Sequence, residues 1–153
     1  MNVLHPLFVH LHIAFLLMAF LAMGYWLAKG LSSSLFDDHI YRFARVCTKL
    51  GVVFIVLSMV AGVRDGFQGT IALFTGLHGG WLLVKATLAT LMLGVYGLFL
   101  HFSGQKPRYL QEDRRLLAWC LVTQAVGVSL MITITTIGTM LVYFRGSLPR
   151  FSL

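Results

Sequence analysis

Residues 3–28 read VLHPLFVHLHIAFLLMAFLAMGYWLA, and this stretch decides the fold. It contains no Asp, Glu, Lys or Arg, and a helix needs about 20 mostly apolar residues to cross the hydrocarbon core of a bilayer. Only helices and closed barrels satisfy their backbone polar groups in lipid. Because the apolar residues here are continuous rather than alternating, we predict a membrane-spanning helix.

Three more stretches have the same character, which predicts further spans at residues 44–63, 78–102 and 116–144. The whole chain agrees, since 58% of its 153 residues are hydrophobic and 11% are charged, with a mean hydropathy of +0.84. Soluble domains carry about 25% charged residues. We therefore predict an all-α integral membrane protein, a four-helix bundle in which residues 1–153 form one domain in contact with the lipid bilayer.

Short polar segments separate the predicted spans. We expect the chain to break at GLSSS (30–34) before Asp37 and Asp38, at DGFQG (65–69) and at SGQKP (103–107), because clustered Gly, Ser, Asp and Pro favour turns. The N-terminus has neither the basic region nor the cleavage site of a secretory signal, so we expect the first span to be retained.

The distribution of Lys and Arg predicts the orientation in the membrane. The side with the first and third connections holds eight of them: Lys29, Arg42, Arg45, Lys49, Lys106, Arg108, Arg114 and Arg115. The other side holds Arg64, Arg145 and Arg150. We therefore expect a multi-pass protein of the inner (plasma) membrane with both termini on the outer side, periplasmic or extracellular. The +7 formal charge is explained by this bias, and we expect no nucleic acid partner.

Ionisable residues inside a span are costly and mark candidate sites. His10 and His12 are about 200° apart around a helix, so they cannot face one centre together. His78 opens the third span from the same side of the membrane. Two imidazoles from different helices at similar depth are typical of axial haem ligands in membrane bundles. His5 lies at the mouth of the first span.

Three cationic side chains fit the same hypothesis. Lys85 follows His78 by seven residues, which places it on the same helix face about 10 Å deeper. There it is suited to pair with a haem propionate, to donate to a quinone carbonyl, or to ligate a metal. Arg64 and Arg145 lie at the predicted outer edge, where propionates favour cationic partners.

Other chemistries have little support in the sequence. The chain has five acidic residues and shows no nucleophile–base pair, phosphate loop, zinc signature or carboxylate dyad, which argues against a hydrolase. The seven methionines are scattered, whereas a soft copper site needs several sulfur atoms together. Cys47 and Cys120 are interpreted as small buried residues.

The segment HPLFVH (5–10) resembles the start of a large bacterial family of small four-helix membrane proteins of unknown function, which begin H-P-x-x-V-H. His78 in GLH (76–78) resembles that family's histidine early in the third span, and GTMLVY (138–143) followed by Gly146 is similar to its G-G-x-L-V-Y-x-x-G close. The resemblance implies a b-type cytochrome, and it implies that His5, His10 and His78 correspond to the family's histidines. Two positions depart from the pattern: His12 replaces the usual proline, and Arg145 stands where a histidine commonly precedes the final glycine.

A second resemblance is weaker. The stretch WLLVK (81–85) is similar to the third span of the membrane-bound protoporphyrinogen oxidase group, whose members are also small four-helix haem proteins. The characteristic first-helix pattern of that group is absent here, so its activity is not carried over.

The leading hypothesis is a membrane b-type haem protein that transfers electrons, for example between a quinol and a redox partner protein at the outer face. His10 and His78 would bind the iron, with His12 as the substitute for His10, and Lys85, Arg64 and Arg145 would hold the propionates. One alternative is a non-catalytic accessory subunit of a larger membrane complex. Another is an oxidoreductase that acts on a porphyrinogen or a quinone. The number of haems and the oligomeric state stay open.

Overall fold

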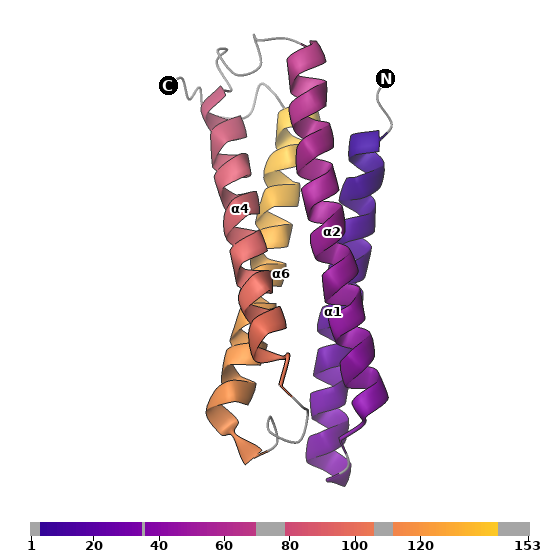
Figure 1. The fold of residues 1–153 in the computed structure, drawn as a ribbon. Helices are drawn as coiled ribbons and strands as arrows, with labels where there is room; N and C mark the ends of the chain where they lie inside the picture. Colours follow the sequence, from indigo (N-terminus) through magenta and orange to yellow (C-terminus); the bar gives the residue numbers. More distant parts are fainter. Residues whose placement is uncertain (1–3, 35, 70–78, 106–111, 144–153) are drawn as a thin grey trace.

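The computed structural model shows a bundle of four helices (Figure 1). The helices are α1 (Leu4–Ser33), α2 (Asp38–Gly69), α4 (Gly79–Phe102) and α6 (Arg114–Tyr143). The structure describes residues 4–34, 36–69, 79–105 and 112–143, and their side chains for 5–34, 36–64, 80–105 and 112–140. Within these ranges there is no strand, and all four helices are long and apolar enough to cross a membrane. The predicted all-α four-helix membrane bundle is confirmed.

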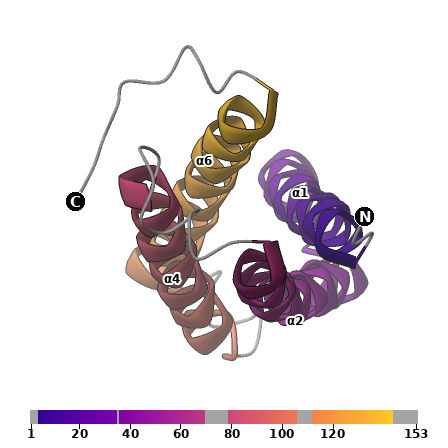
Figure 2. The same ribbon diagram turned by 90° about the horizontal axis from the view of Figure 1, so that it is seen from above.

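The helices form two antiparallel hairpins. α1 packs mainly on α2 and α4 packs mainly on α6, while smaller contacts of α2 with α4 and of α1 with α6 close the bundle (Figure 2). We call the end at which α1 and α4 begin the N-terminal end. The opposite end, where α1 is followed by α2, is called the turn end (Figure 1).

The helix ends differ from two of the predicted breaks. α1 continues through the 30–34 segment as far as Ser33, where the hydroxyls of Ser32 and Ser33 donate to the carbonyl of Lys29 at 3.2 and 2.7 Å. Ser34 then takes a positive φ of 56°, a conformation that ends helices. The break predicted at 65–69 is wrong, since α2 extends to Gly69. The break after Phe102 is confirmed.

Aspartates cap the two helices that begin at the turn end. The Oδ1 atom of Asp37 accepts the backbone N–H of His39 at 3.0 Å, immediately before α2. Asp113 does the same for α6, accepting from the N–H groups of Arg115 and Leu116 at 2.9 and 3.3 Å. A capping carboxylate satisfies backbone donors that have no partner within the helix, which fixes where α2 and α6 begin.

Two apolar clusters fill the interior. The first, which we call the central layer, takes Leu16, Ile55, Met92 and Met131 from the four helices in turn. The second lies toward the turn end.

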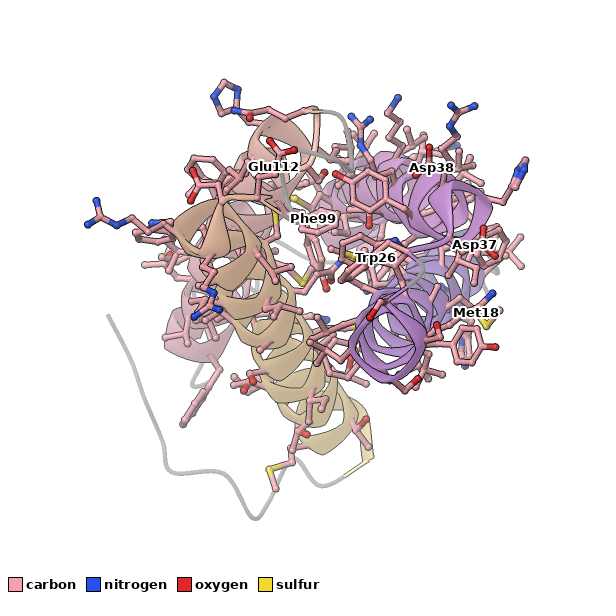
Figure 3. All side chains as sticks on the ribbon, turned by 90° about the horizontal axis from the view of Figure 1, so that it is seen from below. Met18, Trp26, Asp37, Asp38, Phe99 and Glu112 are labelled. Carbon is pink, nitrogen blue, oxygen red and sulfur yellow. The ribbon has the colours of Figure 1, made fainter. Side chains whose placement is uncertain are left out.

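The cluster near the turn end contains Trp26, Tyr41, Phe99 and Cys120, again one residue from each helix. Figure 3 shows Trp26 and Phe99 directed into the space between the helices. The rings of Trp26 and Tyr41 lie 5.3 Å apart between their centroids. The Trp26–Tyr41 contact lies within the first hairpin, and the cluster as a whole joins the two hairpins because it takes residues from all four helices.

The outer faces of the helices are also apolar, with exposed side chains such as Leu21, Val60, Leu91 and Ile132 on all four helices. Exposed apolar faces on every side are what a bilayer requires, because lipid tails take the place of water around the bundle. The chain is thus a multi-pass membrane protein in contact with the lipid bilayer.

The close packing of Gly51 in α2 against Leu16 in α1 yields a testable prediction. A Cβ atom at Gly51 would lie 2.5 Å from Cδ2 and 2.7 Å from Cγ of Leu16, whose side chain is fully buried and has no room to move. We expect Gly51→Ala to destabilise the bundle by about 1–3 kcal/mol, the usual cost of overpacking. Gly94→Ala is the matched control, since nothing lies within 4 Å of its added methyl group. Thermal unfolding in detergent micelles measures both, and equal stability of the two variants would contradict the packing.

A second prediction concerns the turn between α1 and α2. Lys29 Nζ donates to Asp37 Oδ2 at 3.0 Å, and this bond, together with the His39 N–H, holds the pKa of Asp37 below its usual value. The stabilisation is therefore present above the unfolded carboxyl pKa of about 3.9 and is lost as the pH falls through the lower folded value.

We expect Asp37→Asn, which keeps a capping side chain, to lower the melting temperature slightly near neutral pH. The difference from the wild-type protein should shrink below about pH 4. A difference that stays constant down to the lowest pH tested would show that the ion pair does not contribute.

Candidate functional site

Polar residues gather in the interior of the bundle toward its N-terminal end. We call His5 and His12 of α1, Ser58 of α2 and Lys85 of α4 the N-terminal polar cluster. His5 and His12 are seven residues apart, about two helical turns, and therefore lie on the same face of α1. His5 and Lys85 are close enough to His12 to interact with it electrostatically.

His12 is the most enclosed member of this cluster. Its side chain is 6% exposed, and its buried Nδ1 atom makes no well-formed hydrogen bond, although the ring lies near enough to the Phe8 backbone one turn earlier to interact with it. A polar atom buried without a partner costs free energy. The imidazole of His12 is therefore suited to bind a ligand in the bundle interior.

His5 is oriented by the neighbouring helix. Its Nδ1 atom lies 2.9 Å from the carbonyl oxygen of Ser58, and because a carbonyl only accepts, Nδ1 carries the hydrogen and Nε2 stays an acceptor. Its ring also packs on the α2 backbone, since a Cβ atom at Gly62 would lie 3.1 Å from Cε1. The half-buried His5 thus has a fixed tautomer and a fixed ring position.

Lys85 brings a positive charge into the same region from the other hairpin. The side chain is half-buried, and Nζ lies 3.1 Å from the position of a Cβ atom at Gly138 on α6. The carboxylates whose side chains the structure describes are at the turn end: Asp37, Asp38, Glu112 and Asp113. The N-terminal polar cluster therefore contains a cation and two imidazoles, and the ammonium group of Lys85 is suited to pair with an anionic ligand group.

His10 lies on the opposite side of α1. Its side chain is exposed, and Nδ1 donates to the carbonyl of Pro6 in the same helix at 2.7 Å. Of the two histidines that the sequence left as alternatives, His12 faces the interior and His10 faces outward.

The remaining predicted site residues contribute less to the described geometry. Arg64 is exposed on α2, near the N-terminal end. His78 and Arg145 lie outside the described residues, so the predicted convergence of His78 with a histidine of the first span stays a prediction. Among the side chains that are described, no group of three His, Cys, Asp or Glu residues is placed to hold a metal ion by itself.

The sequence did not identify Ser58 as a member of the cluster, or Gly62 and Gly138 as its neighbours. Small residues in apolar spans have several uses, and nothing in their spacing distinguishes these three. It also overlooked Gln124, which is 1% exposed in the middle of α6. An amide inside a predicted span is itself a signal of a polar interior.

Comparison with known proteins gives no match to a family model, to a curated protein or to a solved structure.

Proposed function

We propose that the protein binds a b-type haem in the half of the bundle nearer the N-terminal end and transfers electrons in the membrane. The observation that carries the proposal is the buried, inward-facing imidazole of His12, whose Nδ1 makes no well-formed hydrogen bond and which lies within electrostatic reach of Lys85.

The donor set fits this group. Imidazole is a common axial ligand of haem iron, and His12 offers one from the enclosed face of α1. Lys85 supplies a positive charge for a propionate. The second axial position is assigned to His78 by the sequence alone. When bound, the haem supplies a one-electron iron couple, which the side chains of this chain lack.

The surrounding residues have supporting roles in this proposal. The central layer lies next to the cluster along the helices and excludes water from the interior. His5, held by the Ser58 carbonyl, presents Nε2 as a proton acceptor at the membrane edge. A lipid-soluble quinol is the class of electron donor that we propose, with a redox partner protein at the outer face as the acceptor. The excess of Lys and Arg at the turn end supports an inner-membrane location with the N-terminal end outside.

The accessory-subunit function remains a second candidate because of one observation. Gly94 and Gly97 are exposed on α4, with nothing within 4 Å of an added Cβ atom. Exposed small residues allow another helix to approach closely in a membrane. The experiments below separate the two functions, because an accessory subunit without a cofactor has no haem spectrum.

The first test compares two histidines of α1. We expect the purified wild-type protein to show the α-band of a reduced b-type haem after dithionite addition, and we expect His12→Ala to lose the haem. His10→Ala should retain it, because that ring faces outward. Pyridine haemochrome analysis measures the haem content, and circular dichroism checks the fold of each variant. A wild-type protein without haem or iron, or equal loss in both variants, would refute the proposal.

The second test concerns Lys85. A nearby positive charge favours the reduced state of a haem, so we expect Lys85→Met to lower the reduction potential by tens of millivolts. Arg64→Met is the control and should change the potential much less, because its exposed charge is screened. Redox titration of both variants gives the comparison. Equal shifts would show that Lys85 does not lie beside the cofactor.

A further inference from the structure

A second polar group lies in the interior, toward the turn end. We call Thr48 of α2, Tyr96 of α4 and Gln124 of α6 the amide layer; the three side chains are 0%, 0% and 1% exposed. Gln124 Nε2 donates to Thr48 Oγ1 at 3.3 Å, and the Thr48 hydroxyl donates to the Ala44 carbonyl at 2.9 Å. Helices α2 and α6 are thus joined by a buried hydrogen bond.

Two atoms of this layer have no partner: Gln124 Oε1 and the Tyr96 hydroxyl. Exchanging the oxygen and nitrogen of the Gln124 amide still leaves an amide atom without a partner. The amide oxygen would then face Thr48, whose hydroxyl hydrogen is already donated to the Ala44 carbonyl. One end of the amide is unpartnered in either orientation. In a membrane interior such groups are expensive, since lipid offers no hydrogen bonds.

Gly127 brings the Tyr96 hydroxyl against the part of α6 that carries Gln124. A Cβ atom at Gly127 would lie 2.6 Å from Cζ of Tyr96 and 2.9 Å from its hydroxyl oxygen, so the phenol lies directly on the α6 backbone. Gln124 is three residues earlier on the same helix face, where Cβ positions are about 5–6 Å apart. The Tyr96 hydroxyl therefore lies within one helical turn of the residue that carries the unpartnered amide oxygen.

We propose that a water molecule is bound between Gln124 and Tyr96. Water donates to the amide oxygen and both accepts from and donates to a phenol, and buried waters typically make about three such bonds. The direct packing of Tyr96 on Gly127 and the burial of all three side chains suit a ligand of this size better than a ring-bearing molecule. This hydration site does not depend on the haem proposal, because the amide layer shares no residue with the N-terminal polar cluster.

Hydroxyl-radical footprinting in ¹⁸O-labelled water tests the proposal on the full chain in detergent. Radiolysis of a bound water oxidises the side chain that contacts it, even where that side chain is inaccessible to bulk solvent. We expect mass spectrometry to find ¹⁸O on Tyr96 severalfold above Phe99, which is also 0% exposed but has no polar side-chain atom to bind a water. Labelling of Tyr96 no higher than that of Phe99 would overturn the proposal and would favour a direct Tyr96–Gln124 hydrogen bond.

Gln124→Leu provides the second arm. It removes one partner of the water, so we expect the labelling of Tyr96 to fall severalfold while that of Phe99 is unchanged. Undiminished labelling in a folded variant would overturn the assignment to Gln124. If the variant does not fold, the wild-type comparison of Tyr96 with Phe99 still decides whether the water is present. Neither readout requires haem, so a failure here is distinguishable from a failure of the haem proposal.

Discussion

The rotation of α1 about its own axis is the constraint on which the candidate site depends. Leu16 packs against Gly51 of α2, and the buried residues of α1 recur three or four positions apart: His12, Leu16, Ala19, Met23 and Trp26. This is the seam of a helix packed on its neighbours. Because His12 falls on that seam and His10 does not, the same packing that stabilises the hairpin decides which imidazole faces the interior.

The sequence predicted the four spans correctly because continuous apolar runs of that length have one structural solution in lipid. The predicted breaks after the first and second spans failed, because α1 and α2 continue into the short polar segments that follow them. A glycine inside a helix costs only about 1 kcal/mol relative to alanine, so these segments extend a helix that has already formed. The sequence also left His10 and His12 as alternatives. α1 is apolar on all sides, so hydrophobicity does not reveal the inward face. Only the contact with α2 does.

Buried polar side chains lie on both sides of the apolar central layer along the described helices. Each polar group joins residues from more than one helix: His5 bonds to the Ser58 carbonyl, and Gln124 bonds to Thr48. Polar residues that serve only to join helices are normally satisfied by those bonds. Here His12, Tyr96 and Gln124 each keep a buried atom without a well-formed hydrogen bond, and because they lie in the two polar groups they are the residues to test.

The division into two hairpins has a consequence for biogenesis. The first hairpin contains His5, His12 and the Ser58 carbonyl that orients His5, and it is synthesised before the second hairpin. Lys85 arrives only with the second hairpin. A ligand that needs both the imidazole and the ammonium group would therefore require both hairpins to be in place.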